Sequence, residues 1–246
     1  METIGGKAMS KWLKGGAFAV GFVLLLFIIQ YQFISTDSGS TWSLPLSGKI
    51  IVVDPGHGGI DGGASSKGGL LEKDVALDIS LILRDYLQQS GALVIMSREE
   101  DKDLADATTK GVRNRKIQDL KRRVQLVNDT GADIFVTLHL NAIPSPRWAG
   151  AQTFYNRTTA ENEELARFIQ EEIRDNLENT NRLAKPIGSV YLLKHAQIPG
   201  ALVEVGFLSN PTEAELLNTE AYQQKVAASI YQGILRYFTN EPAPSS

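Results

Sequence analysis

The sequence predicts an α/β domain of three layers, in which a central sheet of about six strands, mainly parallel or mixed, carries helices on both faces. Short apolar runs of four to eight residues, rich in valine and isoleucine, alternate with longer segments of helical period. With 246 residues, 43% of them hydrophobic, the chain can bury a core without disulfides, and it has no cysteine. These properties exclude disordered and fibrous proteins.

The N-terminal segment, residues 1–36, has the pattern of an export signal. Three lysines precede an uninterrupted apolar run, residues 15–29, which continues with interruptions to Ile34. A basic region before ~15 apolar residues is typical of a secretory signal, whereas the extension to Ile34 approaches the ~20 residues that span a bilayer. No clear cleavage site follows. We expect a signal peptide or an N-terminal membrane anchor, and a remainder that works outside the cytoplasm, secreted or on the outer face of the membrane.

The charge balance argues against nucleic acid as the main partner. The whole chain has 25 basic and 28 acidic residues, a formal net charge of −3. Without residues 1–36 the chain keeps 22 basic and 27 acidic residues, a net charge of −5. An acidic exported part offers no electrostatic basis for binding a polyanion.

The rest of the chain divides into a linker, one domain and a tail. Residues 37–47 begin with a polar, serine-rich stretch and are interpreted as a linker. Residues 48–240 are predicted to form a single domain, since neither an internal repeat nor a second domain is evident. Residues 241–246 contain two prolines and are predicted to be a frayed tail.

Six apolar runs are predicted to be strands: Lys49–Asp54, Ala92–Ser97, Ile134–His139, Gln152–Tyr155, Ser189–Leu193 and Ala201–Val205. A helix is predicted between the first two strands, because Val75, Ile79, Ile82 and Tyr86 recur at intervals of four, three and four. Glu72 lies one step earlier on that face, so it should point toward the sheet. Further helices are predicted at about 112–129, 160–177 and 220–238, with a short one after Pro211.

Polar side chains lie at the ends of three predicted strands. His57 follows the first strand in a glycine-rich loop, His139 closes the third and Glu204 closes the sixth. Open α/β sheets bind ligands at the carboxyl ends of their strands, so these groups can converge there. Glu72, at the start of the first domain helix, can reach the same edge.

Each of these residues also has an ordinary structural interpretation. The glycine-rich loop can be a tight turn or a phosphate cradle, although its spacing matches no nucleotide-binding motif. A histidine at a strand end is often a hydrogen-bonded core residue, and Glu72 suits a helix N-terminus. Glu204 is harder to explain in this way, because it is flanked by apolar residues and a buried charge is costly unless it is paired or bound to metal.

As a set, the four residues favour a metal site. Catalytic zinc commonly takes two histidines and one glutamate and leaves a position for water. A further carboxylate beside that water can act as general base. The sequence has neither His-Glu-x-x-His nor Gly-x-Ser-x-Gly, which argues against a zincin-type peptidase and a serine hydrolase. From the residues alone, a metal hydrolase site and a purely structural role both stay open.

Six features in order also resemble the zinc-dependent N-acetylmuramoyl-L-alanine amidases of the amidase 3 type, over roughly residues 48–238. They are Val53–Gly59, Glu72, Arg98, Arg123, Thr137–Ala142 and Glu204–Asn210. Two further segments, 42–49 and 226–238, are similar to the germination-specific branch of that family.

The resemblance implies one Zn²⁺ ion held by His57, Glu72 and His139, with Glu204 as the catalytic carboxylate. It also implies, more weakly, that three residues contact the substrate or support the ligands: Asn141, Arg98 and Arg123. The remaining histidine, His195, matches no family ligand, and we expect it to line the cleft or face solvent. A site with three histidines on the metal is the alternative, and it would leave Glu72 unexplained.

The implied substrate is peptidoglycan, cut at the amide between the lactyl group of N-acetylmuramic acid and L-alanine. The germination-specific branch implies spore cortex maturation, in which removal of the stem peptide precedes formation of muramic δ-lactam, and hence a location in the forespore or cortex space. Some relatives need an accessory activator protein. Two other functions stay open: a zinc peptidase acting on the stem peptide, and a non-catalytic glycan-binding module.

Overall fold

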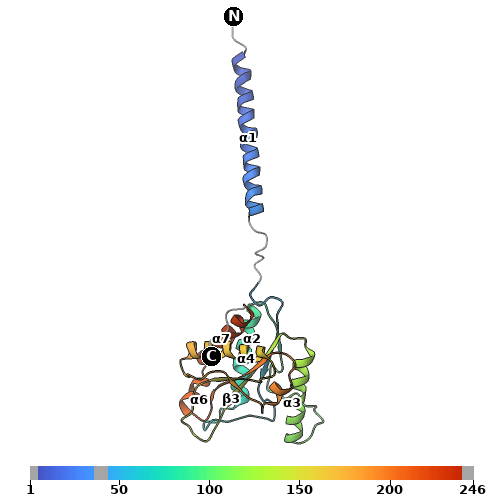
Figure 1. Cartoon of the computed structure of the whole chain (residues 1–246), viewed down its shortest axis with the longest axis vertical. Helices are drawn as coiled ribbons and strands as arrows, with labels where there is room; N and C mark the ends of the chain where they lie inside the picture. Colours follow the sequence, from blue (N-terminus) through green and yellow to red (C-terminus); the bar gives the residue numbers. More distant parts are fainter. Residues whose placement is uncertain (1–4, 36–43, 240–246) are drawn as a thin grey trace. The chain divides into compact units, whose positions relative to one another are not determined.

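The computed structural model describes residues 5–35 and 44–239 (Figure 1). The chain forms two compact units, Met1–Ser43 and Leu44–Ser246. The first contains helix α1 (Gly5–Ser35), in which the side chains that can be described are exposed. Within the described parts of the chain, no helix combines the length and apolar character needed to cross a membrane. Residues 37–43 of the predicted linker and the predicted tail lie outside the described residues.

The second unit is built on one mixed sheet of six strands. Their order is β2 (Leu93–Met96), β1 (Ile50–Pro55), β3 (Ile134–Asn141), β6 (Gly200–Phe207), β4 (Gln152–Tyr155) and β5 (Lys185–Pro186). Strands β2, β1, β3 and β6 are parallel, whereas β4 runs antiparallel to β6. The mixed six-stranded sheet predicted from the sequence is therefore confirmed.

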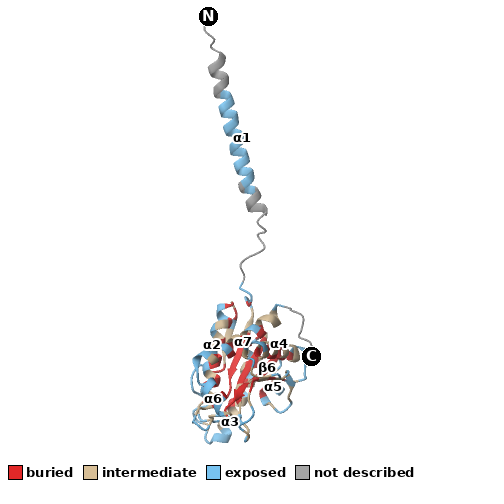
Figure 2. Ribbon diagram, turned by 90° about the vertical axis from the view of Figure 1, so that its left-hand side faces the viewer, coloured by how far each residue is buried: buried red, intermediate tan, exposed pale blue. Residues whose placement is uncertain are grey.

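Helices cover both faces of the sheet, which gives the three predicted layers. One face carries α2 (Glu72–Gln89), α4 (Ala160–Leu177) and α7 (Glu220–Phe238), and the other carries α3 (Val112–Asp129) and α5 (Tyr191–His195). Alternation along the strands explains this division, because successive side chains point to opposite faces. Ile51 and Val53 join the first core cluster and Val52 joins the second. Figure 2 shows these strands buried at the centre of the domain.

One predicted strand is wrong. Residues 189–193 do not form a strand; they lead into the short helix α5, in which Lys194 N donates to Val190 O and Ala196 N to Leu192 O. The outermost strand is instead Lys185–Pro186. The apolar run was too short to show a period, and a short buried helix and a buried strand then have the same pattern.

The buried face of α2 is slightly rotated from the predicted one. Its fully buried apolar residues are Val75, Ala76, Ile79, Leu83 and Leu87. Ile82 and Tyr86 lie half-buried at the margin of that face. Glu72 is buried, with 4% of its surface exposed, and it faces the sheet as predicted.

The carboxyl ends of β1, β3 and β6 meet at one edge of the sheet. In the register of these strands Asp54 lies opposite Thr137, and His139 lies opposite Glu204. The ladder is irregular between His139 and Asn141, immediately after the histidine. The glycine-rich loop leaves β1 at this edge, and α6 (Pro211–Leu217) follows β6. The strand ends that carry His139 and Glu204 and the loop that carries His57 therefore meet at this edge.

Candidate metal centre

Three of the predicted residues form a compact cluster at this edge. The Glu72 Oε1 atom lies 3.1 Å from His57 Nε2 and 2.9 Å from His139 Nδ1. One ligand atom from each residue lies within 4.8 Å of the others. Two imidazole nitrogens and one carboxylate oxygen are a donor set that zinc uses. The 2.9 and 3.1 Å separations approach the roughly 3.3 Å between tetrahedral ligands with bonds of about 2.0 Å, so the cluster fits a zinc ion.

Glu72 is held in place by the backbone around it. Its Oε2 accepts a hydrogen bond from Ala64 N at 2.8 Å, and its Oε1 accepts one from Leu140 N at 3.0 Å. Burial raises the pKa of this carboxyl, but the hydrogen bonds and charges of His139 and His57 outweigh burial and hold the pKa well below its usual range. Glu72 is therefore an ionised carboxylate fixed between the two histidines.

His57 is fixed through both its side chain and its backbone. It has a positive φ of 59°, which is unusual for a residue with a side chain. Arg123 Nη2 donates to its carbonyl oxygen, and Asp61 Oδ2 lies 2.8 Å from its Nδ1. Burial lowers the pKa of His57, yet the hydrogen bonds and charges of Glu72 and Asp61 raise it above its ordinary value. The Asp61 contact leaves Nε2 directed at Glu72.

Asp61 is a site residue that the sequence interpretation missed. Histidines that bind metal commonly present their second ring nitrogen to a carboxylate, which fixes the ring orientation. Asp61 lies four residues after His57 in the same loop. This rule, applied to the carboxylates near His57 in the sequence, could have identified Asp61. Lys116 Nζ on α3 lies 2.8 Å from the same oxygen, Asp61 Oδ2.

The second histidine packs against the backbone of the glycine-rich loop. A Cβ atom at Gly56 would lie 2.5 Å from His139 Cε1, closer than real Cβ contacts come. Glycine is therefore needed at position 56 for the imidazole to sit beside Glu72.

Glu204 enters the same space from β6, opposite His139. Its Oε2 is buried and has no hydrogen-bond partner. Burial raises the pKa of this carboxyl to about 7; the nearby charge of His139 opposes that shift, and the charge of Glu72 adds to it. A carboxyl group that titrates near neutrality can both accept and donate a proton, as a general base and acid must.

The two predicted arginines are buried next to the site, and Arg123 also lines the cavity beside the cluster. Arg98 is 2% exposed and donates to the carbonyl oxygens of Pro55 and Gly56. Arg123 is 3% exposed and pairs with Asp54 at 2.6 Å. Both guanidinium groups therefore bind the backbone or the carboxylates that support the glycine-rich loop.

The other two predicted residues make contacts of their own. Asn141 ends β3 opposite Phe207, and its backbone oxygen accepts from Leu208 N. His195 ends α5, where it is exposed and its ring lies 4.4 Å from that of Tyr191. It is not part of the metal-binding group, so the alternative with three histidines has no support in this geometry.

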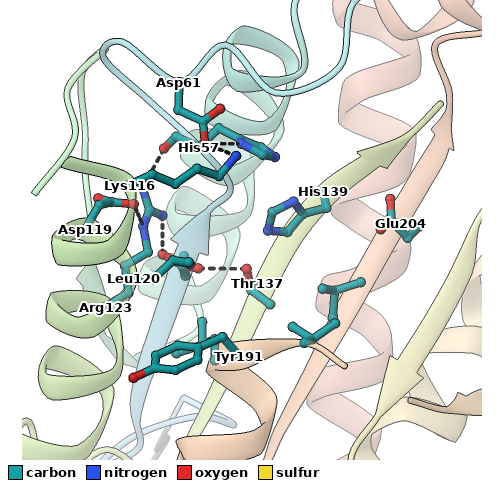
Figure 3. A pocket seen from close by; sticks show the side chains of 14 residues that line it. His57, Asp61, Lys116, Asp119, Leu120, Arg123, Thr137, His139, Tyr191 and Glu204 are labelled. Atoms are coloured by element: carbon teal, nitrogen blue, oxygen red, sulfur yellow. Dashed lines mark hydrogen bonds and ion pairs between the residues drawn. The ribbon is translucent and has the colours of Figure 1, made fainter. Parts of the chain in front are cut away.

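A cavity of about 300 Å³ opens beside the cluster (Figure 3). His57, His139 and Glu204 lie along it, and Thr137 lies between the histidines and Tyr191. The cavity therefore reaches both histidines of the candidate metal cluster and Glu204 together.

The fold and the site together define a class of protein: an α/β domain with three residues that could hold a metal ion, and a glutamate beside them, at the carboxyl edge of its sheet. A family model described as N-acetylmuramoyl-L-alanine amidase matches residues 51–236. The chain is 58% identical over 236 residues to the germination-specific N-acetylmuramoyl-L-alanine amidase of Bacillus subtilis strain 168, which covers 96% of this chain and 99% of that protein.

Solved structures agree with this match. The CwlD amidase from Clostridioides difficile, solved in complex with the GerS lipoprotein, has a TM-score of 0.77 and 42% identity, covering 78% of this chain and 100% of that one. An N-acetylmuramoyl-L-alanine amidase from Clostridium difficile 630 has a TM-score of 0.69 and 30% identity, covering 79% and 98%. This chain belongs to the N-acetylmuramoyl-L-alanine amidase family, and the family resemblance predicted from its motifs is confirmed.

Replacement of Glu72 by glutamine is expected to remove the metal. The variant keeps the size of the side chain but loses the negative charge between the two histidines. Loss of a residue that only hydrogen-bonds to a ligand lowers metal affinity by up to ~100-fold, so loss of a ligand itself should lower zinc affinity by more than that. Zinc content after gel filtration, measured by elemental analysis, checks this. Glu161→Gln, at the exposed start of α4, is the matched control and should keep its zinc. Full zinc occupancy in Glu72→Gln would contradict the ligand assignment.

Proposed function

We propose that this chain is a zinc-dependent amidase that hydrolyses the amide between the lactyl group of N-acetylmuramic acid and L-alanine in peptidoglycan. The observation that carries the proposal is the arrangement at one cavity of His57, Glu72 and His139 with the unpartnered carboxyl group of Glu204. These are one metal-ligand set and one proton-transfer group, which is what metal-assisted amide hydrolysis requires.

His57, Glu72 and His139 would hold the ion. When bound, a zinc ion supplies a Lewis acid that polarises a carbonyl oxygen and makes water more acidic. Glu204 accepts a proton from the attacking water and then donates a proton to the amide nitrogen. The carbon–nitrogen bond breaks, leaving a lactyl carboxylate and the free amino group of L-alanine. Asp61 keeps the His57 ring in its ligating orientation throughout.

The biological setting follows from the relatives and from the N-terminal segment. The B. subtilis relative is named germination-specific, which supports a role of this chain in making spore cortex competent for germination through muramic δ-lactam formation. The basic and apolar N-terminal pattern supports export to the outer face of the membrane, as a cleaved or a retained segment. The C. difficile relative was solved with a lipoprotein, which supports an accessory partner here as well.

Product analysis of digested peptidoglycan tests this function. Purified sacculi are incubated with the zinc-loaded full chain, and the released material is analysed by mass spectrometry with and without a chelator. We expect stem peptides with free L-alanine amino termini and glycan strands with free lactyl groups, both lost with the metal. New ends within the stem peptide would instead identify a peptidase. Chelator-independent binding without cleavage would identify a glycan-binding module.

A further inference from the structure

The cavity beside the metal cluster holds several polar groups whose hydrogen bonds are already used inside the protein. Asp54 accepts from Arg123 and Ser97 on Oδ1 and from Thr137 on Oδ2. Asp119 accepts from Leu104 N on Oδ1 and from Arg123 Nε on Oδ2. These groups therefore have little capacity left to recognise a ligand.

Lys116 is different. Its side chain is 48% exposed, it lines the cavity, and its ammonium group is paired with Asp61 Oδ2 at 2.8 Å. An ammonium has three donors, so this contact leaves two of them for a ligand. Figure 3 shows Lys116 beside His57 at the cavity, with Tyr191 across from it.

The position of Lys116 relative to the metal cluster is closely bounded. Lys116 Nζ and His57 Nδ1 both contact the same oxygen, Asp61 Oδ2, at 2.8 Å, so the two nitrogens lie no more than twice that distance apart. An extended chain advances about 3.3–3.6 Å per residue. The ammonium group therefore lies within about two residues of peptide of the His57 ring, whose other nitrogen, Nε2, faces Glu72.

The size and walls of the cavity suit a peptide better than a glycan strand. A volume of about 300 Å³ is at the lower limit of ligand pockets and matches a short segment of a substrate. A glycan strand continues in both directions, whereas a stem peptide is attached at one end. Four apolar residues also line the cavity, and they suit an alanine methyl group: Leu120, Val190, Leu192 and Leu202.

We propose that this cavity receives the stem peptide and that Lys116 determines specificity by binding the carboxylate of the residue that follows L-alanine. That residue is D-glutamate linked through its side chain, so its α-carboxylate is free unless it is amidated. The proposal rests on the proposed amidase function. Lys116 then acts in substrate binding, while Asp61 Oδ2 keeps its contact with His57 Nδ1.

A cycle of two enzymes and two substrates tests the proposal. The substrates are muramyl tripeptides of the same sequence that differ only in carrying D-glutamate or D-isoglutamine after L-alanine, and zinc-loaded full chain is compared with Lys116→Met. We expect Lys116→Met to lower kcat/KM for the D-glutamate substrate by about 10- to 100-fold, the worth of one hydrogen bond to a charged group, mainly through KM. For the D-isoglutamine substrate we expect Lys116→Met to change kcat/KM by less than about threefold, which is smaller than the effect of losing one such hydrogen bond. Lys116→Arg should restore most of the preference.

Lys121→Met, an exposed lysine on the same helix outside the cavity, is the control and should leave both substrates unaffected. Equal losses for both substrates with Lys116→Met would overturn the proposal, since Lys116 would then act only by holding Asp61. Unchanged kinetics would overturn it too. Wild-type enzyme that cleaves neither substrate at the lactyl amide would overturn the amidase function itself and this inference with it.

Discussion

Replacement of Glu204 by glutamine is expected to lower the rate of lactyl amide cleavage by about 10²- to 10⁴-fold, the usual contribution of a general acid–base group. Glutamine keeps the shape of the side chain but cannot accept the proton of the attacking water. Because Glu204 is outside the metal-ligand group, zinc content should not change. The reaction is followed by mass spectrometry of released stem peptides, with zinc measured on the same preparation.

The stability of this variant provides an internal control. The Oε2 atom of Glu204 is buried without a hydrogen-bond partner, and an ionised group in that state opposes folding. A neutral amide at this position should therefore leave the melting temperature unchanged or raise it. Near-normal turnover in a folded, zinc-loaded Glu204→Gln protein would show that another group transfers the proton.

Replacement of Arg123 by methionine is expected to cost about 3–5 kcal/mol of the free energy of unfolding, the range for breaking a buried ion pair from one side. Arg123 pairs with Asp54 at 2.6 Å and with Asp119 at 2.8 Å. Its loss leaves Asp54, which is 1% exposed, as a buried charge without its cation. Denaturant unfolding measures the loss.

The effect of Arg123→Met should depend on pH. Burial raises the pKa of Asp54 in the native protein, but Arg123 and the hydrogen bonds from Ser97 and Thr137 bring it below its ordinary value. This lowered pKa stabilises the native protein above the unfolded pKa, and that contribution is lost as the pH falls. In the variant, burial without the cation should raise the pKa of Asp54, so the deficit in stability should be largest near pH 7 and shrink toward pH 4.

The neighbouring Arg122→Met is the matched control. Arg122 pairs with Asp106 on the surface, where both side chains are at least 40% exposed. Exposed pairs contribute about 0–1 kcal/mol, so this variant should differ little from wild type. Equal losses for the two arginine variants would contradict the role given to the buried Asp54–Arg123 pair.

Most of the fold could be predicted because its elements have clear periods. The strands of the sheet centre are apolar runs that are buried on both faces, and the long helices repeat their apolar residues over several turns. The exception, 189–193, has two adjacent buried leucines, Leu192 and Leu193, in a segment too short to show a period. The sequence also contains too little signal for a strand as short as Lys185–Pro186.

The part of the site that lies at strand ends and on the first domain helix could be predicted from the sequence. His57, His139 and Glu204 were predicted from their positions at or just after the ends of predicted strands, and Glu72 from the helical face. Asp61 was missed although it lies four residues after His57 in the same loop. Lys116 was missed because its contact with Asp61 depends on how an irregular loop folds against α3, 55 positions further along the chain. No local period determines such a contact. The interior position of Arg98 and Arg123 likewise depends on the loop that they hold.

Diffraction from crystals of the zinc-loaded chain, measured at the zinc absorption edge, tests the metal site most directly. We expect one anomalous peak between His57 Nε2, His139 Nδ1 and the Glu72 carboxylate, at about 2.0–2.2 Å from each ligand atom, with the Glu204 carboxyl group outside bonding distance. A peak bound by Glu204 or by His195, or no peak at this cluster in an active preparation, would contradict the assignment of ligands and base.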